Sequence, residues 1–244
     1  MTRVRLTLAY VGTGFAGWQV QGNAPTVQGC LEHALARICN LPVRVHASGR
    51  TDSGVHALGQ VAHFDPPPER GHIPWRRALN AILPGDVAVV AAQTAPPDFH
   101  ARFSASSKEY SYTLWTEPGY VLPQRRPFVW PVSGIDLDAM QEAADHLTGL
   151  HDFAAFQNVG TPVKSTVREL TRAHVTDAGL EKVWHFRADG FLKQMVRNIM
   201  GCLVEVGRGR LSPDRIPGLL ASTNRSLLPA TAPPQGLCLE KVTY

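Results

Sequence analysis

The sequence predicts an α+β protein with two domains, each following the element order β-α-β-β-α-β. In the first hundred residues, alternating and helical apolar patterns succeed one another in this order. A similar order recurs after the break at Ala95-Pro96-Pro97. The length of 244 residues admits one large domain or two modest ones. We therefore expect an N-terminal domain over residues 1–97 and a C-terminal domain over residues 98–244.

The first domain is expected to hold four strands and two helices. From Val27 onward, apolar residues recur at helical spacing, so Thr26 is the expected N-cap of the first helix. A polar loop over residues 48–58 joins the second and third strands. The expected elements are strands at residues 6–10, 43–47, 60–64 and 87–93, and helices at residues 27–39 and from Pro74.

The second domain repeats this order with a longer second helix. That helix covers residues 192–206 and is mostly apolar, but Arg197 and Asn198 interrupt it. The other expected elements are strands at residues 108–115, 170–175, 183–188 and 237–242, a helix around residues 137–147 and a short helix at residues 213–220. The order in each half is the ferredoxin-like arrangement, which is also the skeleton of RNA-recognition modules. We expect antiparallel sheets that flank a central cleft.

Composition and charge exclude several classes of protein. Hydrophobic residues make up 44% of the chain and no apolar run approaches a membrane span, which excludes disordered, fibrous and integral membrane proteins. The N-terminal residues lack the apolar block of a signal peptide, so a cytoplasmic location is expected. Lys and Arg number 24 against 20 acidic residues, and arginine dominates, which suits phosphate and base recognition. The chain has no basic tail, so the fold would have to build any RNA surface from arginines such as Arg102, Arg125, Arg126, Arg208 and Arg210.

The segment Gly12-Thr13-Gly14-Phe15-Ala16-Gly17 spells G-x-G-x-x-G after a strand, the pattern of a dinucleotide-binding turn. That site needs a helix that starts within the glycines, whereas here the helix is expected only at Val27. The acidic residue expected about 20 positions later is also missing. A nicotinamide-dependent oxidoreductase is therefore disfavoured, and a turn-rich loop that needs glycine is the simpler interpretation.

The loop over residues 47–57 concentrates reactive side chains between two strands. It contains Arg50, Asp52 and His56 together with two glycines that can shape the backbone. A carboxylate flanked by cations suits a nucleophile or a base, because a nearby arginine keeps it ionised. The alternative is a β-turn in which Asp52 only bonds its own backbone.

Other candidate binding residues lie in the second half. Aromatic and basic residues interleave in Phe99–Ala105 and from Lys108 to Tyr112. Such a composition can stack bases and hold phosphates. The alternative is that Tyr110 and Tyr112, two residues apart on a strand, face one side and simply pack. Arg197 in an apolar helix requires a partner such as Asp52, unless it lies on the solvated side. The scattered histidines and cysteines show no ligand spacing, so no metal is expected.

Residues 49–57, Gly-Arg-Thr-Asp-Ser-Gly-Val-His-Ala, resemble the signature of the TruA family of tRNA pseudouridine synthases. Five further blocks resemble family blocks in the same order and spacing, and together they span nearly the whole chain. These blocks are Gly17-Trp18-Gln19, Leu83-Pro84-Gly85-Asp86, Phe99–Ala105, Tyr110-x-Tyr112 and Met195–Ile199.

The resemblance implies an isomerase that converts uridine to pseudouridine at positions 38, 39 and 40 of the tRNA anticodon stem-loop, without cofactor or metal. It implies that Asp52 is the catalytic nucleophile, which attacks either C6 of the base or C1′ of the ribose. Tyr110 resembles the tyrosine that stacks on the target base, Arg197 the arginine that pairs with the aspartate, and Arg50 is expected to contact RNA beside the flipped nucleotide. It further implies a homodimer whose subunits have two ferredoxin-like domains.

Three positions depart from the family pattern: Ser53, Ser111 and Gln194 stand where alanine, a basic residue and histidine are common. Asp52, Tyr110 and Arg197 are retained. The main alternative is a non-catalytic RNA-binding module in which Asp52 merely shapes a turn.

Overall fold

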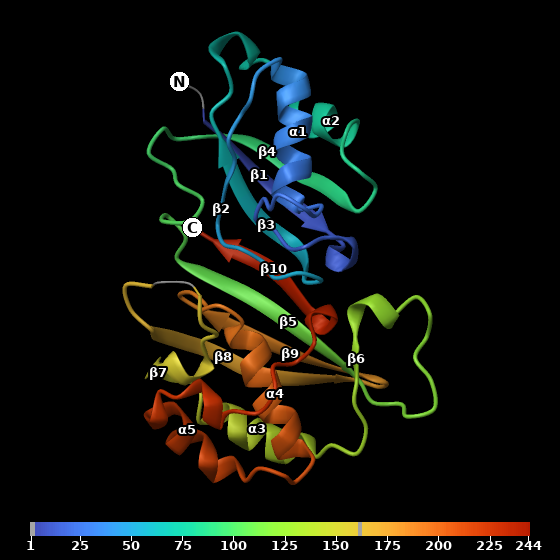
Figure 1. The fold of residues 1–244 in the computed structure, drawn as a ribbon, viewed down its shortest axis with the longest axis vertical. Helices are drawn as coiled ribbons and strands as arrows, with labels where there is room; N and C mark the ends of the chain where they lie inside the picture. Colours follow the sequence, from blue (N-terminus) through green and yellow to red (C-terminus); the bar gives the residue numbers. More distant parts are fainter. Residues whose placement is uncertain (1–2, 161–162) are drawn as a thin grey trace. The chain divides into compact units, whose positions relative to one another are not determined.

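The computed structural model describes residues 3–160 and 163–244, which divide into two compact units (Figure 1). Unit 1 contains the residues up to Ser106 together with Cys238–Tyr244, and unit 2 contains Ser107–Leu237. The expected domain boundary at residues 97 and 98 therefore differs from the observed one. Residues 98–106 pack on the sheet of unit 1, and the last strand, expected in the second domain, belongs to unit 1.

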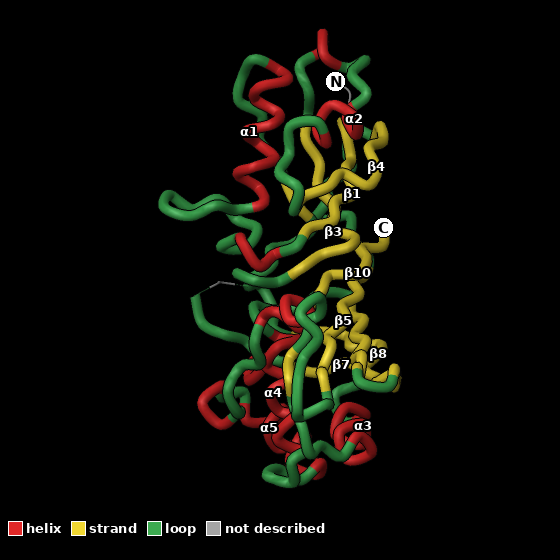
Figure 2. The backbone as a smooth tube through the Cα atoms, turned by 90° about the vertical axis from the view of Figure 1, so that its right-hand side faces the viewer, coloured by secondary structure: helices red, strands yellow, loops and turns green. Residues whose placement is uncertain are grey.

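Unit 1 has a sheet with helices on one face (Figures 1 and 2). Strand β1 lies between β4 and β3 and is antiparallel to both; β2 also pairs antiparallel with β3, and β10 pairs parallel with it. The elements are β1 (Arg3–Tyr10), α1 (Val27–Cys39), β2 (His46–Ala47), β3 (His56–Phe64), α2 (Trp75–Asn80), β4 (Val87–Ala95) and β10 (Leu237–Thr243), with 3₁₀ helices η1 (Gly12–Gly14) and η2 (Pro68–Arg70).

The pattern of burial explains which of these elements the sequence predicts well. Helix α1 has the predicted bounds, and the Thr26 hydroxyl caps it by accepting the Gly29 N–H at 3.2 Å. Strand β1 alternates between buried and half-buried residues, the pattern that made it recognisable. Strand β3 begins at His56, earlier than predicted, because it is buried on both faces and its apolar residues do not alternate.

The other face of this sheet is covered by the chain itself. Arg5 and His63 are directly paired on β1 and β3, and the Nδ1 of His63 accepts the Ala101 N–H at 3.1 Å. The Tyr244 hydroxyl donates to the Ala101 carbonyl at 2.7 Å, and the Arg5 guanidinium lies 4.4 Å from the Tyr244 ring centroid. The sheet face that RNA-recognition modules leave open for RNA is thus occupied here by residues of the same chain.

The burial of His63 predicts an acid-sensitive step in stability. Burial, with the nearby charge of Arg3, lowers the pKa of His63 to about 4 in the folded protein. The unfolded chain binds the proton near pH 6.5, so the free energy of unfolding should fall as the pH drops from 6.5 to 4, by at most about 1.4 kcal/mol per pH unit. Urea unfolding of wild type and His63→Gln across this range should show the steeper decline in wild type. Parallel declines would contradict this account.

Unit 2 has an antiparallel sheet in the order β5-β9-β8-β7, and β6 pairs parallel with β5. Helix α4 lies against this sheet in both views (Figures 1 and 2). The elements are β5 (Ser107–Trp115), β6 (Trp130–Pro131), α3 (Leu137–Asp145), β7 (Gly149–Asp152), β8 (Val167–Ala178), β9 (Glu181–Ala188), α4 (Met195–Gly207) and α5 (Ile216–Ser222), with 3₁₀ helices η3 (Arg126–Phe128), η4 (Ala154–Phe156), η5 (Pro213–Arg215), η6 (Arg225–Leu227) and η7 (Pro234–Gly236).

Helix α4 begins three residues later than its apolar pattern predicts. Gln194, just before it, has a left-handed backbone with φ of 60°, which no α-helix can continue through. The helix is buried along nearly its whole length, including Asn198. The short strands β6 and β7 were not predicted, because two to four residues are too few to show a period. No helix in the described ranges is long and apolar enough to cross a membrane.

Candidate active site

Asp52 lies at the first position of a tight turn that leads into β3. The Val55 N–H donates to the Asp52 carbonyl at 3.2 Å, and Gly54 has φ of 78°, which a residue with a Cβ rarely adopts. The β-turn of the alternative interpretation is therefore present, and the catalytic role of the Asp52 side chain stays a prediction. It holds Asp52 half-buried and Ser53 exposed.

The glycine-rich loop is the support of this turn. The Trp18 N–H donates to the Thr51 carbonyl at 3.1 Å, and Gly17 has φ of 88°. A Cβ at Gly17 would come within 2.6 Å of the Thr51 carbonyl oxygen, and a Cβ at Gly12 would overlap the Val55 carbonyl. The glycines allow the two backbones to cross in contact, and α1 starts only at Val27, so the pattern serves the Asp52 turn and not a pyrophosphate.

A buried polar network fixes the residues on the N-terminal side of Asp52. The Thr51 hydroxyl is 2.9 Å from the Tyr10 hydroxyl, and the Gln60 amide donates to the Gly49 carbonyl at 3.0 Å and to Tyr10 at 3.4 Å. The Ser48 hydroxyl donates to Gln60 Oε1 at 2.7 Å. Burial raises the pKa of Tyr10 to about 12, so its hydroxyl stays protonated and shares a hydrogen bond with the Thr51 hydroxyl.

Gln60 and Tyr10 are site residues that the sequence analysis missed. Gln60 is fully buried, and its amide bridges the strand and the loop that carries Asp52. Gln60 could have been recognised because it is a single glutamine in an otherwise apolar strand. A buried amide needs hydrogen-bond partners, so such a residue indicates a polar network. Both residues act on the position of the Asp52 loop through hydrogen bonds.

Arg50 is exposed two residues before Asp52. Its side chain makes no ion pair with any residue in the described part of the chain. A guanidinium that is not paired with a carboxylate of the chain can donate two parallel hydrogen bonds to one phosphate. The RNA contact expected of Arg50 stays a prediction.

Arg197 lies half-buried on α4, where a chain segment anchors it. Its Nε donates to the Ala232 carbonyl at 2.8 Å, and the Ala232 N–H donates to the Arg197 carbonyl at 3.1 Å. The side chain is thus anchored to the backbone of a neighbouring segment and is not fully solvated. This anchoring fixes the direction in which the guanidinium points.

A buried network beside Arg197 was also missed. Asn198 is fully buried; its amide donates to the Phe156 carbonyl at 2.8 Å and to Asn158 at 2.9 Å. Its oxygen accepts from Thr231 at 2.7 Å and from Arg225 at 3.1 Å. Asn158 also bonds Gln194, a position that departs from the family pattern. These contacts tie residues 156–158 and 231 to α4 next to Arg197.

The two tyrosines of β5 have different surroundings. Tyr110 is half-buried, and its ring meets Phe191 edge-on with centroids 5.1 Å apart. Tyr112 is fully buried, and its hydroxyl donates to the Pro233 carbonyl at 2.7 Å. Tyr112 is therefore a packing residue, as the simpler hypothesis held, while Tyr110 keeps part of its ring accessible for stacking.

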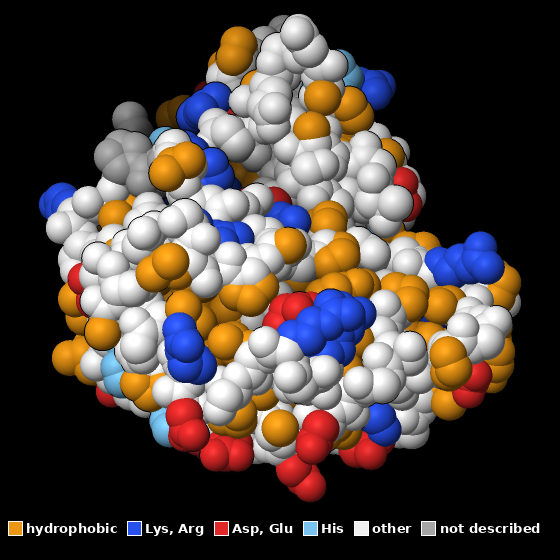
Figure 3. Space-filling model, turned by 60° about the horizontal axis from the view of Figure 1, so that its bottom comes forward, with side chains coloured by type: hydrophobic (Ala, Val, Ile, Leu, Met, Phe, Trp, Pro, Cys, Tyr) orange, Lys and Arg blue, Asp and Glu red, His pale blue; other side chains and the backbone are white. Residues whose placement is uncertain are grey.

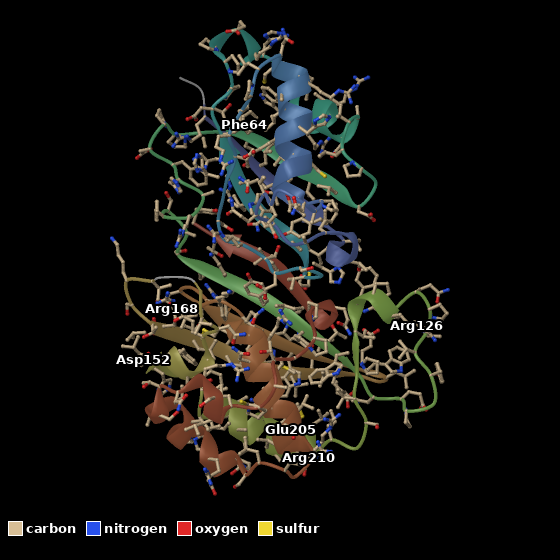
Figure 4. All side chains as sticks on the ribbon, viewed as in Figure 1. Phe64, Arg126, Asp152, Arg168, Glu205 and Arg210 are labelled. Atoms are coloured by element: carbon tan, nitrogen blue, oxygen red, sulfur yellow. The ribbon has the colours of Figure 1, made fainter. Side chains whose placement is uncertain are left out.

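The expected gathering of arginines does not occur within unit 2. Arg125 pairs with Glu181 through two bonds of 2.5 and 2.9 Å, and Glu205 pairs with both Arg208 and Arg210. Figure 4 shows Arg126 and Arg210 at different places on this unit. On the face in Figure 3, basic side chains form separate groups with acidic ones close to several of them. Ion pairs within the unit therefore neutralise much of the positive charge of these arginines.

Other reactive groups offer little to a reaction. The four cysteines are free, and burial raises the pKa of Cys202 and Cys238 to about 12, which disfavours their thiolates. Within residues 3–160 and 163–244, no three His, Cys, Asp or Glu side chains form a cluster that could hold a metal ion.

Comparisons with known proteins agree on one family. A family model described as tRNA pseudouridine synthase matches residues 7–104 and 143–244, ranges that include Asp52 and Arg197 but not Tyr110. A relative from Solidesulfovibrio magneticus named tRNA pseudouridine synthase A is 58% identical, over 100% of this chain and 92% of its own. Relatives of the same name from Nitratidesulfovibrio vulgaris (strain Miyazaki F) and Burkholderia cenocepacia are 48% and 44% identical, over 100% and 99% of this chain and 100% and 90% of theirs.

These matches cover both units and define an isomerase that acts on RNA. The chain belongs to the tRNA pseudouridine synthase family, and it converts uridine to pseudouridine in tRNA. A solved chain from a Cbf5-Nop10-Gar1 complex aligns over 82% of this chain and 45% of its own, but at 12% identity and a TM-score of 0.36 it is too distant to bear on the fold.

Proposed function

We propose that this enzyme isomerises uridine at positions 38, 39 and 40 of the tRNA anticodon stem-loop, with Asp52 as the nucleophile and without a cofactor. The observation that carries the proposal is the rigid turn that presents Asp52. Backbone crossings at Gly12 and Gly17 and the buried Tyr10–Gln60 network fix this turn from two sides. Such preorganisation is what a positioned nucleophile needs.

The proposed reaction moves one bond and leaves the atoms of the nucleoside unchanged. The Asp52 carboxylate attacks either C6 of the base or C1′ of the ribose, and the bond between N1 and C1′ breaks. The detached uracil turns in the pocket, and C5 then bonds to C1′. C5 loses its proton, N1 gains one, and the bond to Asp52 is released. The carboxylate is regenerated, so no oxidant, reductant or energy source is consumed.

A uridine in a stem must leave the helix before Asp52 can reach it. Unstacking costs a few kcal/mol, which contacts to the phosphates and stacking in the pocket have to offset. We assign base stacking to Tyr110, whose ring is braced by Phe191 and partly accessible. We assign a phosphate contact to the exposed Arg50.

We further propose that both units are ferredoxin-like and that the enzyme is a cytoplasmic homodimer. The antiparallel order β4-β1-β3-β2 in unit 1, with α1 and α2 between successive strands, supports the first part. The dimer and the location come from the family resemblance.

The test uses unmodified tRNA transcripts that carry a single uridine at position 38, 39 or 40, and a fourth that carries none there. Conversion, measured as pseudouridine content at each site with no cofactor and with a metal chelator present, is expected in the first three. Conversion in the fourth, or at sites outside the anticodon stem-loop, would overturn the proposed position. Binding without conversion in any transcript would favour a non-catalytic module.

The role of Arg197 can be separated from general RNA binding. Arg197→Gln should lower kcat by roughly 10²-fold, because the family resemblance implies that Arg197 is the cation that pairs with the reacting aspartate and stabilises its charge in the transition state. Arg197→Lys keeps the charge but loses the Nε bond to Ala232, so an intermediate loss is expected. Single-turnover rates and tRNA affinity are measured for both, with exposed Arg215→Gln as control. An equal loss in rate and affinity would show that Arg197 only binds RNA.

A further inference from the structure

Phe103 is an aromatic side chain held in solvent by a rigid turn of unit 1. It is 75% exposed, whereas Ala101 two residues earlier is fully buried. Burying a phenylalanine side chain stabilises a fold by about 2 kcal/mol relative to leaving it in solvent, so the exposure of Phe103 does not contribute to stability. The ring is therefore available for a partner.

The turn that carries Phe103 is built from its own side chains. The Nδ1 of His100 accepts the backbone N–H groups of Arg102 and Phe103 at 3.1 and 3.4 Å. The Ser104 N–H donates to the His100 carbonyl at 2.9 Å, and the Ser104 hydroxyl accepts the His100 N–H at 3.0 Å. The four bonds leave the turn little freedom to collapse over its own phenylalanine.

A chain of aromatic rings in contact supports Phe103 from beneath, tilted between Phe103 and His100 and edge-on between His100 and His63. The His100 ring lies 4.4 Å from the Phe103 ring, and the His63 ring lies 4.7 Å from His100. His46, whose residue is exposed, stacks on His63 at 5.2 Å. Below them, β3 anchors His63, so Phe103 is the outermost ring of a column that starts in the sheet.

The charge around this column is positive. The Arg102 guanidinium lies 5.6 Å from the Phe103 ring centroid, and it forms no ion pair with a residue in the described ranges. Arg3 is also close, although Asp65 neutralises it at 2.7 Å. A phenyl ring and a free guanidinium side by side match the base and the phosphate of one nucleotide.

This surface is separate from the Asp52 turn. His56 follows that turn at the start of β3, and His63 lies seven residues further along the same strand, a distance of roughly 23 Å at the rise of an extended strand. A nucleotide at Phe103 cannot be the one that reacts at Asp52.

We propose that Phe103 and Arg102 form a second contact for the tRNA substrate, in which an unpaired base stacks on Phe103 and its phosphate binds Arg102. The proposal rests on the assignment of tRNA as substrate and adds a binding residue for it. The contact strengthens tRNA binding and fixes the position of the tRNA on the enzyme, and it takes no part in the chemical steps.

The test separates the stacking contact from the charge contact. Phe103→Ala should raise the tRNA dissociation constant roughly 5- to 100-fold, and Phe103→Tyr should keep it near wild type. Neither variant should change the single-turnover rate at saturating tRNA. Arg102→Gln should lower the slope of log Kd against log salt by about 1, whereas Phe103→Ala leaves that slope unchanged. Leu150→Ala, at a residue 69% exposed on unit 2, is the matched apolar control.

The outcomes distinguish the possible occupants. Unchanged tRNA affinity in Phe103→Ala and Arg102→Gln, with wild type still forming pseudouridine, overturns the contact but not the proposed function. Absence of conversion by wild type counts against the proposed function itself. A shift of oligomeric state in Phe103→Ala, measured by light scattering, assigns the surface to a second copy of the chain and overturns the tRNA contact.

Discussion

Replacing Asp52 with asparagine is expected to lower pseudouridine formation by roughly 10⁴-fold or more while tRNA binding persists. The amide has nearly the same shape and keeps the turn, because the turn depends on the Asp52 backbone carbonyl and on Gly54. It cannot act as a nucleophile toward carbon. Pseudouridine content of a tRNA transcript and tRNA affinity are measured on the same protein preparation.

Ser53→Ala is the matched control for this loop. Ser53 is exposed on the same turn, and its hydroxyl makes a single bond of 3.2 Å to the Phe15 carbonyl. Activity close to wild type is expected, because the change removes one hydrogen bond at an exposed position and leaves the Asp52 carboxylate in place. If Asp52→Asn retained turnover, Asp52 would be a turn residue and the nucleophile would have to lie elsewhere.

Gly12→Ala is expected to cost about 2 kcal/mol of stability and roughly 10²-fold of activity. An added Cβ would overlap the backbone of Val55, so the glycine-rich loop and the Asp52 turn would have to move apart. The same glycine donates its N–H to His56 Nδ1 at 3.0 Å, a bond that this movement would stretch. Thermal unfolding and single-turnover rates report the two effects.

Gly14→Ala provides the comparison within the same motif. A Cβ at Gly14 meets no atom within 4 Å, and Gly14 does not have a positive φ. We expect a change in stability within about 0.5 kcal/mol and normal activity. Similar losses in both variants would show that the loop acts through a shared property of its glycines and not through the contact of Gly12 with Val55.

Local patterns predicted elements whose stability is decided locally. Helix α1 has its expected bounds because an apolar stripe and a capping threonine both lie in its own sequence. The start of β3 was missed because burial on both faces removes the alternation. The expected domain boundary differs from that of the two compact units, because residues 98–106 and 238–244 belong to unit 1 through contacts distant in sequence.

The candidate site divides in the same way. Motif resemblance predicted Asp52, Arg50, Tyr110 and Arg197, and their catalytic and binding roles stay predictions. Gln60 and Asn198 could not be assigned partners in advance, because each bonds residues more than ten positions away. The glycine pattern suggested a dinucleotide site, whereas the structure shows that Gly12 and Gly17 are needed for close backbone contact with Val55 and Thr51.

The return of the last strand to unit 1 affects how the chain folds during synthesis. Strand β10 pairs with β3, the Ser106 N–H donates to the Thr243 carbonyl at 2.8 Å, and Tyr244 bonds Ala101. Unit 2 is synthesised entirely before these residues, and domains generally fold as they emerge from the ribosome. Until residues 238–244 leave the ribosome, the start of β3 lacks its β10 partner and Ala101 lacks its bond to Tyr244. The unit that carries Asp52 therefore completes its fold last, after the unit that carries Arg197 is already made.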